Sequence, residues 1–456
     1  MLTERGNWDS FPDSSGACEL EVGSHGFLRG AGKSVEKRCA MIQVEDALNI
    51  ILKETLPLGT EKVAILDSLG RVLGAPVFSG RIIPPRDNSS MDGYAVHEVD
   101  TQGASFSNSV ILEVIEDIPA GSIPRRVVGI GQAARIMTGA PIPEGADAVI
   151  RVEDTRQDGT RVELIAAVKK GENIRFAGED VREGEEVILA GTVVRPAEVG
   201  MMAALGKSFV SVYQRPVVAV IATGDELADI DAPVSSWKIV NSNAYSLTAQ
   251  ILECGAIPLQ IGIARDNRED LLAKFRPALR ADVILSSGGV SVGDYDMVKD
   301  IMTEVGTDIE FWRVAMKPGK PLVYGRISGK PIFGLPGNPV STMVSFEQFV
   351  RPVLLKMMGH RHLFRRTVQA VLKEGLNKQP ELTYFVRVHV ERENGGYVAV
   401  LTGEQSSGIL KSMVRANGLA ILPKGVQNIS PGERVTVQMI DDSFNMTLNP
   451  EYFQER

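Results

Sequence analysis

The chain has 456 residues, enough for about three domains with an ample hydrophobic core. Its formal net charge of -8 argues against a general nucleic-acid binder, because phosphate backbones are held by clustered Lys and Arg. No stretch approaches the roughly 20 apolar residues of a membrane span, and the N-terminus lacks the apolar core of a signal peptide, so we expect no membrane partner. Three widely spaced cysteines, Cys18, Cys39 and Cys254, disfavour a disulfide framework or a zinc knuckle and suit a reducing, cytoplasmic location.

The N-terminal stretch is the least patterned part of the chain. Residues 1–40 are rich in Gly, Ser and mixed charge without a sustained apolar period, which predicts a flexible extension. From Val44 onward, apolar residues recur at helical spacing and predict an amphipathic helix. A bend at 84–95 then gathers turn-forming residues around Asp87 and Asp92. This bend is equally typical of a self-bonded turn without a role in binding.

Residues 96–183 alternate short Val and Ile segments with Gly and Pro turns, which predicts a mostly β domain. Within it, Thr138 stands at a strand end, and Arg175 lies close to Asp180 in the sequence. A strand followed by a surface salt bridge would explain these residues without function. A short helix at 196–205 follows, so we expect the helices before and after the β domain to pack together as one discontinuous part.

The clearest pattern begins at residue 216, where apolar strands alternate with amphipathic helices. This alternation predicts a parallel sheet with helices on both faces and a ligand at the carboxyl ends of its strands. The residues at those ends include Glu226, Asp266 and the stretch 286–296. Carboxylates or small polar residues at three strand ends favour a binding site over ordinary turns. The predicted strands are Pro216–Ala222, Gly255–Ile263, Ala281–Leu285 and Pro331–Leu335.

The stretch 286–296 reads SSGGVSVGDYD and directly follows an apolar strand. Gly288 and Gly289 would let backbone N–H groups approach a phosphate closely. Asp294 and Asp296 would place carboxylates on the rim, and a carboxylate beside a phosphate usually needs a divalent cation between them. From these residues alone, a Gly-rich connection between strand and helix is an equally good interpretation.

Cationic side chains and a predicted helix start lie near the same sheet edge. Arg313, Lys317 and Lys320 surround a Pro-Gly turn. Asn338 suits the N-cap of a helix over 339–358, because its side chain can accept a backbone hydrogen bond there. The positive end of that helix dipole and the nearby lysines together favour a pocket for phosphate or another oxyanion.

Residues 367–438 alternate apolar and polar residues between turns and predict a small β domain or barrel. His360 and His362 precede it as a His-x-His pair, but no third metal ligand is evident nearby. We therefore favour a solvated linker over a metal site at this position.

Six motifs, in order along the chain, resemble those of the molybdopterin molybdenumtransferase family, known as MoeA in bacteria and as the E domain of gephyrin. A single Gly-rich turn would be weak evidence, whereas six ordered motifs from about residue 43 to the C-terminus are specific. The motifs are DNSSMDGYA (Asp87–Ala95), RIMTGAPIPEGADAVI (Arg135–Ile150), TGDEL (Thr223–Leu227), SSGGVSVGDYD (Ser286–Asp296), KPGKP (Lys317–Pro321) and GLPGNPVS (Gly334–Ser341).

The resemblance implies a multidomain α/β plus β fold in an elongated homodimer. Its parts would be a flexible extension (1–40), a discontinuous helical linker domain (41–82 and 184–212), a β-rich insertion (83–183), a MogA-like doubly wound α/β domain that binds molybdopterin (213–360) and a C-terminal β-barrel (365–456). The resemblance also implies the reaction, in which molybdate and adenylyl-molybdopterin give molybdenum cofactor and AMP with the help of Mg²⁺. Molybdopterin adenylyltransferase and the molybdoenzymes that accept the cofactor would be its partners.

Matched motif by motif, the resemblance assigns the site residues. The catalytic group would be Asp92, Thr138, Arg175, Asp180, Glu226, Asp266 and Asp296. The metal ion would be held by the acidic residues Asp180, Glu226, Asp266 and Asp296. The substrate-binding group would be Ser287, Gly288, Gly289, Asp294, Arg313, Lys317, Lys320, Pro321, Pro336, Asn338, Arg387 and Ser407. In a dimer, the insertion of one copy would complete the cleft of the other.

Some positions depart from the family pattern, and two other functions stay open. Arg313 stands where Lys is frequent, and Glu404 places a carboxylate near the implied oxyanion site, where it would oppose molybdate. One alternative is molybdopterin adenylyltransferase, which shares the α/β domain but not the insertion and barrel. The other is a non-enzymatic scaffold, against which the retained acidic residues argue. The sequence does not decide between molybdate and tungstate.

Overall fold

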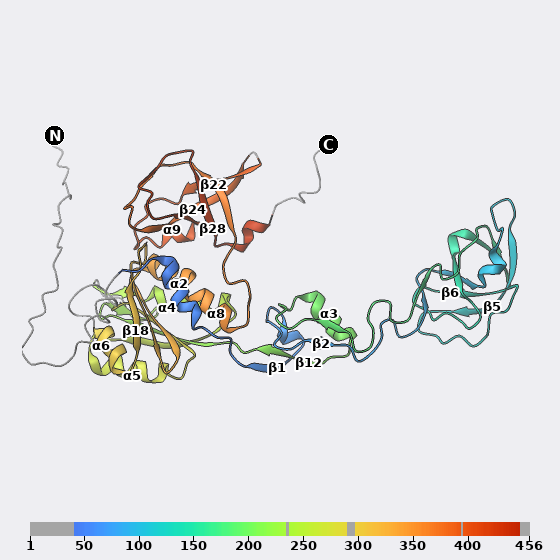
Figure 1. Ribbon diagram of the computed structural model, residues 1–456, viewed down its shortest axis with the longest axis horizontal. Helices are drawn as coiled ribbons and strands as arrows, with labels where there is room; N and C mark the ends of the chain where they lie inside the picture. Colours follow the sequence, from blue (N-terminus) through green and yellow to red (C-terminus); the bar gives the residue numbers. More distant parts are fainter. Residues whose placement is uncertain (1–40, 234–236, 290–296, 394, 447–456) are drawn as a thin grey trace, which may run out of the picture.

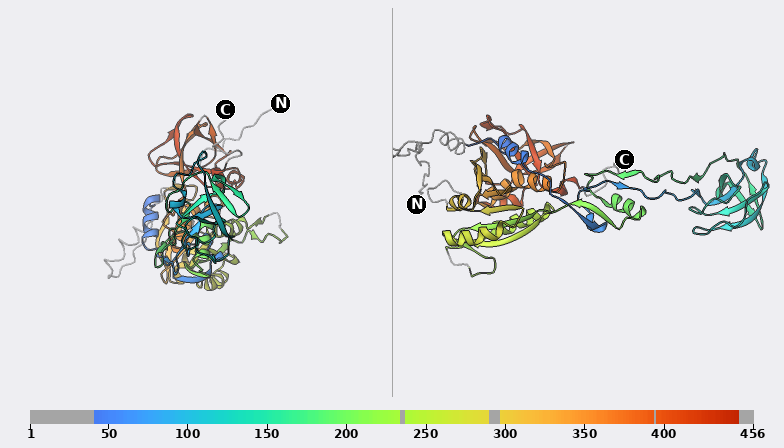
Figure 2. Two further views of the ribbon diagram at one scale, coloured as in Figure 1. Left: turned by 90° about the vertical axis from the view of Figure 1, so that its right-hand side faces the viewer. Right: turned by 60° about the horizontal axis from the view of Figure 1, so that its bottom comes forward.

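The computed structural model of the chain describes residues 41–233, 237–289, 297–393 and 395–446 (Figure 1). The described chain is elongated: an α/β part and a barrel lie together at one end, a slender linker follows, and a β-rich part lies at the far end (Figures 1 and 2). The predicted site residues Asp294 and Asp296 and the extension over 1–40 lie outside the described residues. Within the described ranges, no helix is both long enough and apolar enough to cross a membrane.

The α/β part is a six-stranded sheet with helices on both faces. Four strands run parallel in the order β16-β13-β17-β21, and β20 and β18 extend the sheet antiparallel. Helices α4, α7 and α8 share one core with the sheet, and α5 and α6 share the other. The strands are β13 (Val217–Thr223), β16 (Ile257–Ala264), β17 (Val283–Ser287), β18 (Asp308–Arg313), β20 (Pro321–Ile327) and β21 (Lys330–Leu335). The helices are α4 (Ser242–Glu253), α5 (Arg268–Ala278), α6 (Met297–Glu304), α7 (Pro339–Ser345) and α8 (Arg351–Met357), with a π-helical turn (Phe346–Val350) between the last two.

The four predicted strands are parallel to one another, as expected, but two further strands extend the sheet antiparallel at one edge. The chain turns back between β20 and β21 at Ser328 and Gly329, whose φ angles are 50° and 80°. Two central residues with positive φ are typical of a tight hairpin turn, which makes the two strands antiparallel. Strand β18 then pairs antiparallel with β20. The pattern of alternating strands and helices did not reveal these strands, because no helix separates β18, β20 and β21.

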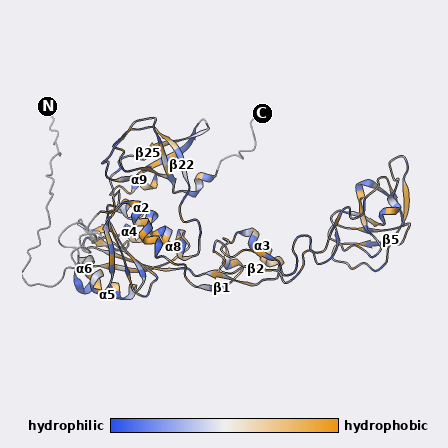
Figure 3. Cartoon of the chain, in the orientation of Figure 1, coloured by the Kyte–Doolittle hydropathy of each residue, from blue (hydrophilic) through white to orange (hydrophobic). Residues whose placement is uncertain are grey.

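Helix α2 (Val44–Lys53) belongs to the α/β core. Its buried residues Val44, Ala47 and Ile51 lie in one cluster with residues of β13 and α8. The prediction that it packs with α3 (Pro196–Ala204), the helix after the insertion, is therefore wrong. The apolar stripe of α2 is already covered by α8, which buries Val353 and Leu354 in the same core, whereas α3 buries Met202 in the linker. Figure 3 shows the apolar residues of both α2 and α8.

The linker consists of two chain segments that run in opposite directions. Strand β1 pairs antiparallel with β12, and β2 pairs antiparallel with β11. With α3 these strands enclose a small core that includes Leu73 and Val212. A discontinuous linker with its own helix is thereby confirmed. Its remaining elements are β1 (Thr60–Ala64), a 3-10 turn (Leu66–Ser68), β2 (Val77–Phe78), β11 (Glu186–Ile188) and β12 (Phe209–Tyr213).

The far part is a six-stranded sheet in the order β7-β4-β6-β5-β9-β8, which confirms the β-rich insertion. Tyr94 and Ile150 lie in the core on one face, and Ala95 and Ile136 lie in the core on the other. Its elements are β3 (Asn88–Ser89), β4 (Gly93–Val96), β5 (Val110–Ile118), β6 (Gln132–Ile136), β7 (Ala148–Arg151), β8 (Thr155–Asp158), β9 (Arg161–Leu164) and β10 (Ile174–Arg175), with 3-10 turns at Glu98–Thr101 and Val152–Asp154.

The C-terminal part is a closed barrel of five strands, as predicted. The strands follow the order β24-β25-β22-β28-β26, and β26 pairs back to β24. Strand β19 (Met316–Lys317) from the α/β part adds to β24, so that Lys317 lies opposite Tyr384. The barrel is therefore joined directly to the α/β part. Its elements are β22 (Thr367–Leu372), β23 (Leu376–Asn377), β24 (Thr383–Glu393), β25 (Gly396–Leu401), α9 (Lys411–Val414), β26 (Gly418–Leu422), β27 (Asn428–Ile429), β28 (Arg434–Met439) and a 3-10 turn (Asp442–Asn445).

Candidate functional site

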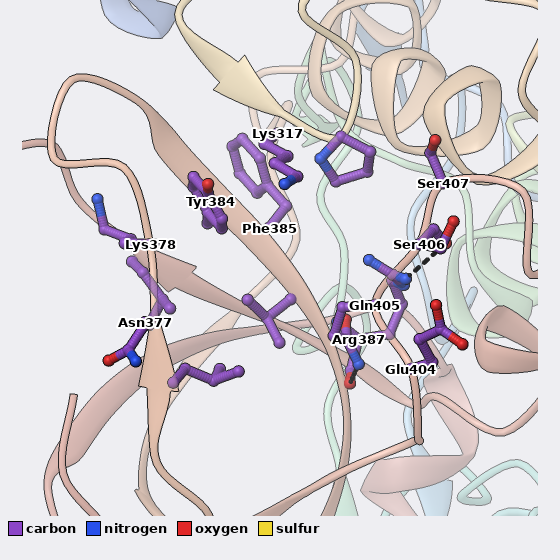
Figure 4. A pocket seen from close by; sticks show the side chains of 14 residues that line it. Lys317, Asn377, Lys378, Tyr384, Phe385, Arg387, Glu404, Gln405, Ser406 and Ser407 are labelled. Atoms are coloured by element: carbon purple, nitrogen blue, oxygen red, sulfur yellow. Dashed lines mark hydrogen bonds between the residues drawn. The ribbon is translucent and has the colours of Figure 1, made fainter. Parts of the chain in front are cut away.

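A cavity of about 470 Å³ lies between strand β19, barrel strand β24 and the loop at 404–407 (Figure 4). We refer to it as the barrel cleft. Two of the predicted cations, Lys317 and Arg387, line it together with the predicted Ser407. Glu404 lies in its wall, as the sequence suggested (Figure 4). The full lining is Lys317, Pro318, Leu376, Asn377, Lys378, Tyr384, Phe385, Val386, Arg387, Glu404, Gln405, Ser406, Ser407 and Leu422.

Arg387 is a buried cation that has no carboxylate partner among the described residues. Only 1% of the surface of Arg387 is exposed. The Nε atom donates to Ser412 Oγ at 3.1 Å, and Nη2 donates to the carbonyl of Ser406 at 3.0 Å. Burial lowers the pKa of Arg387 to about 10, so the side chain is still charged near neutral pH. A buried and unpaired charge is costly, and an anion in the cleft would remove that cost.

Tyr384 lies between two ammonium groups at the other end of the cleft. Lys317 Nζ is 5.4 Å from the centre of its ring, and Lys378 Nζ is 5.3 Å from it. Lys378 is 6% exposed and donates to the carbonyl of Leu382 at 2.8 Å, so it fixes the turn that carries Tyr384. Sequence analysis missed Lys378, because nothing in the local pattern indicates that this lysine is buried.

Asn338 connects the barrel cleft to the carboxyl ends of the sheet strands. It stands at the predicted cap position before α7, but its side chain makes no capping hydrogen bond. Instead, its Nδ2 donates to Ser407 Oγ at 3.0 Å. Asn338 therefore occupies the predicted cap position but does not form the predicted cap bond. The hydrogen bond that Nδ2 donates to Ser407 fixes the direction of its amide instead. Asn338 brings the sheet edge and the barrel into contact.

A second cavity, of about 340 Å³, lies at the strand ends, and we refer to it as the strand-end pocket. Four predicted residues, Glu226, Ser287, Gly288 and Asn338, line it. One wall is formed by the paired strands β14 (Leu227–Ala228) and β15 (Ile239–Val240). Among the described residues of its lining, Glu226 carries the one charge, and neither Lys nor Arg is present. This pocket therefore offers amide, hydroxyl and apolar groups, and the cations lie in the barrel cleft.

Asn243 ties the floor of the strand-end pocket together. Its Nδ2 lies 2.8 Å from Ser287 Oγ, 2.8 Å from the carbonyl of Gly337 and 3.3 Å from Thr342 Oγ1. The contact with a carbonyl fixes which end of the amide is the donor. Sequence analysis placed Asn243 before a helix without assigning it a role. Asn243 contacts three segments that are distant in the sequence, so only the folded structure shows this role.

Gly288 and Gly289 serve close packing at the strand end. Their φ angles are 95° and 65°, and a Cβ on Gly288 would lie 2.5 Å from the carbonyl oxygen of Thr223. The N–H of Gly288 donates to the carbonyl of Leu335 at 3.1 Å. This N–H is therefore not turned toward a phosphate, contrary to our interpretation of the Gly-rich turn.

The three predicted metal ligands that the structure describes, Asp180, Glu226 and Asp266, do not come together in one chain. Asp266 Oδ2 accepts the N–H of Asp225 at 3.3 Å, and Asp225 Oδ1 accepts the N–H of Asp266 at 3.2 Å. Glu226 lines the strand-end pocket, whereas Asp180 lies beyond the linker, at the stem of the insertion. Within the part of the chain that the structure describes, no three His, Cys, Asp or Glu side chains are placed to hold a metal ion. The described ligands of a single chain therefore do not by themselves form a magnesium site.

Other predicted binding residues lie outside both cavities. Arg313, Lys320 and Pro321 are in neither lining. Pro336 contributes its carbonyl, which accepts hydrogen bonds from the hydroxyl groups of Thr342 at 2.5 Å and Ser287 at 3.4 Å. Pro336 therefore holds Ser287, a residue of the strand-end pocket, in place through a hydrogen bond.

The predicted site residues of the insertion form a separate group. Asp92 Oδ1 accepts from the N–H of Thr138 at 2.6 Å and from its hydroxyl at 2.8 Å. Arg175 lies on β10, and no ion pair joins it to a described residue, so the alternative interpretation as a surface salt bridge is not supported. The insertion and the α/β part lie at opposite ends of the chain (Figure 1). One chain alone does not assemble the predicted catalytic group.

The Thr138→Val variant tests the pairing at Asp92. The backbone N–H of Thr138, and next its hydroxyl, hold the pKa of the Asp92 carboxyl below its ordinary value. We expect the variant to raise this pKa only part of the way back, because the N–H remains. Carboxyl carbon NMR during a pH titration measures the shift. Thr138→Ser, which keeps the hydroxyl, should leave the pKa low, and an unchanged pKa in Thr138→Val would contradict the assignment.

Three family models match the chain one after another. The MoeA N-terminal region (domain I and II) matches residues 42–206, the probable molybdopterin binding domain matches residues 219–356, and the MoeA C-terminal region (domain IV) matches residues 369–440. These matches follow the structure: the first spans the linker and insertion, the second the α/β part, and the third the barrel.

Curated relatives match nearly the whole chain. The molybdopterin molybdenumtransferase of a Nostoc species is 37% identical over 431 residues, which cover 92% of this chain and 98% of that protein. The Bacillus subtilis protein of the same name is 36% identical over 411 residues, with 89% and 95% covered. The crystal structure of the molybdopterin biosynthesis MoeA protein from Pyrococcus horikoshii matches with a TM-score of 0.75 at 31% identity, covering 88% of this chain and 100% of that one. The chain belongs to the molybdopterin molybdenumtransferase family.

Proposed function

We propose that this chain is a molybdopterin molybdenumtransferase, which inserts molybdate into adenylyl-molybdopterin and releases AMP. Arg387 is the observation that carries the proposal, because it is a buried cation without a carboxylate partner in a cleft shared with Lys317 and Ser407. An anion that enters this cleft meets charge-assisted donors that are already in place. Molybdate, a tetrahedral dianion, suits such a site.

In this proposal each cavity binds one of the two substrates. The barrel cleft holds molybdate: Ser407 Oγ accepts from Asn338, so the Ser407 hydroxyl proton is free to donate to an oxyanion. Arg387 uses Nε and Nη2 within the protein, which leaves Nη1 for the anion. The strand-end pocket, with no Lys or Arg in its described lining, holds the uncharged ring system of the other substrate. Asn338 places the two beside each other.

The acidic residues of the insertion come from a second copy in this proposal. Asp92 belongs to the insertion and Asp180 to its stem, whereas Glu226 belongs to the α/β part, and the insertion and the α/β part lie at opposite ends of the elongated chain (Figure 1). A homodimer in which each insertion reaches the other copy would bring them together, and a two-fold axis makes both clefts alike. Mg²⁺ then binds only where residues of both copies meet, since the described residues of one chain do not provide a site.

A mixing experiment tests the composite cleft. Asp92→Asn and Glu226→Gln are each expected to abolish release of AMP from adenylyl-molybdopterin with molybdate. When the two variants are mixed and exchange subunits, half of the dimers at most are mixed, and each has one intact cleft. We therefore expect recovery of up to about a quarter of wild-type activity. No recovery, despite mixed dimers seen by native mass spectrometry, would show that the groups act within one chain.

Direct assays separate this function from the alternatives. Glu226→Gln and Asp180→Asn should stay folded and lose activity, and full activity in both would refute the catalytic assignment. A molybdopterin adenylyltransferase would instead consume ATP, and a scaffold would bind neither molybdate nor AMP. Assays with molybdate and tungstate in parallel identify the oxyanion.

The remaining expectations are part of the same proposal. We propose a cytoplasmic protein that receives adenylyl-molybdopterin from an adenylyltransferase and passes the cofactor to molybdoenzymes. We also propose functional units at 83–183 for the insertion, 213–360 for the α/β domain and 365–456 for the barrel, with the linker at 41–82 and 184–212 and the extension at 1–40. Helix α2, although inside the first linker range, packs with the α/β domain.

A further inference from the structure

A third cavity, of about 320 Å³, lies at the joint between the linker and the α/β part, outside both cavities of the candidate site. We refer to it as the joint cavity. The linker contributes Val72 and Tyr213 to its wall, and the α/β part contributes the end of α4 and the residues of α8. The two parts are in direct contact beside it, because a Cβ on Gly359 would lie 2.2 Å from the Tyr213 ring. Any ligand in the joint cavity therefore touches both parts.

Basic side chains predominate in the wall of the joint cavity. Arg71, Arg215, Arg351 and His360 line it, against one carboxylate, that of Glu253. Glu253 is already engaged, since Arg365 lies 2.5 Å from its Oε1. The wall thus carries an excess of hydrogen-bond donors.

Two of these guanidinium groups keep donors that the protein does not use. Arg351 Nη1 donates to the carbonyl of Leu363 at 3.4 Å, and Arg351 pairs with Glu347 through Nε and Oε2 at 3.9 Å, which is too far for a hydrogen bond. The Nε proton of Arg351 therefore has no acceptor among the described residues. Arg215 makes no ion pair or side-chain hydrogen bond with any residue described. Arg71 differs, because it is bound to Glu61 and to the carbonyl of Tyr213. Arg215 and Arg351 are therefore the groups that an anion would satisfy.

We propose that the joint cavity binds a small organic anion, with its sulfate, phosphate or carboxylate head between Arg215 and Arg351. The apolar side chains of Leu355, Met358 and Val72 line the same cavity and receive the body of the ligand. Guanidinium groups suit these heads, because they form paired, charge-assisted hydrogen bonds. This site is separate from the proposed transferase chemistry and does not depend on it.

His360 gives the site a pH dependence. Burial, and then the charge of Arg351, lower the pKa of His360, so the imidazole of the empty cavity is neutral at pH 7. Besides His360 and Arg351, the ionisable groups of the wall are Arg71, Tyr213, Arg215, Glu253 and Cys254. A bound anion offsets the arginines and favours the protonated imidazole. Anion affinity should therefore rise as the pH falls toward the ordinary pKa of histidine.

Isothermal titration of the full chain with butanesulfonate and with sulfate tests the proposal. Both probes stay fully charged from pH 5 to 8, so any change of affinity with pH comes from titration of the protein. The titration uses the Arg387→Met variant, in which the barrel cleft does not compete. We expect one site per chain, with butanesulfonate bound about tenfold more tightly than sulfate because of its apolar body. Arg215→Met and Arg351→Met should each weaken binding about tenfold or more, and His360→Gln should flatten the pH profile.

Matched controls keep the result interpretable. Arg268→Met removes an exposed arginine that pairs with Glu304 on the same α/β part, and it should leave binding unchanged. Arg215 is exposed, so its substitution tests the site even if Arg351→Met unfolds the joint. Absence of binding, binding that survives Arg215→Met with undiminished affinity, or a pH profile that His360→Gln does not alter overturns the proposal. Absence of binding is also the result expected if a second copy of the chain occupies the joint cavity and blocks the ligand.

Discussion

Arg387→Met is expected to abolish molybdate binding and to lower kcat/KM at least about 100-fold, while the chain stays folded. The reason is that no carboxylate among the described residues pairs with this buried cation. The variant loses the hydrogen bonds to Ser412 and Ser406, worth about 1 kcal/mol each, but also the cost of burying a charge. We therefore expect the free energy of unfolding to change by less than about 2 kcal/mol. Equilibrium dialysis of molybdate and thermal unfolding measure the two effects.

Two further variants sharpen this test. Arg387→Lys keeps the charge, but an ammonium group does not reproduce the planar fork that contacts Ser412 and Ser406, so we expect intermediate affinity. Arg434→Met removes an exposed arginine from the same barrel and should bind molybdate like the wild type. Wild-type molybdate affinity in Arg387→Met would show that the barrel cleft is not the oxyanion site.

Most of the α/β part was predictable from the sequence, because buried parallel strands are continuous apolar runs and the helices between them are amphipathic. The strands β13 and β21 lie within one residue of their predicted bounds, and β16 and β17 lie within two. The strands β18 and β20 were missed, because they follow one another without a helix and pair through a tight turn. The packing of α2 was missed for a related reason: an apolar stripe shows that a helix has a partner but does not identify it.

The candidate site was predictable in its residue types but not in its assembly. Cations near residue 317 and in the barrel were expected to bind an oxyanion, and Lys317 and Arg387 do line one cavity. That Arg387 is buried without a carboxylate partner, and that Asn338 reaches Ser407, depends on contacts between distant segments. The separation of Asp92 from Glu226 depends on the length of the linker, which no local pattern encodes (Figure 1).

Arg365→Met is expected to give the opposite result from Arg387→Met: a large loss of stability at a residue that lies in neither cavity of the candidate site. Arg365 is 7% exposed and contacts Glu347, itself 8% exposed, at 3.1 Å, as well as Glu253 and Asp442. Removal of one partner from a buried pair typically costs about 3–5 kcal/mol, because the other charge stays buried. We expect the first thermal transition to fall by about 10 °C. The contacts of Glu253 and Asp442 add little, since both carboxylates are largely exposed.

The pH dependence of Arg365→Met identifies the cause of the loss. Burial raises the pKa of Glu347, and the nearby charges of Arg365 and Arg351 oppose that rise. Without Arg365 the pKa rises further, so the native state binds a proton that the unfolded state releases, and stability must fall as the pH increases. The variant should therefore lose less stability at pH 5 than at pH 8, as measured by thermal unfolding at both. Adding Glu347→Gln should restore stability at pH 8, and a loss that is equal at both pH values would show that the missing packing of the side chain, not the charge, is responsible.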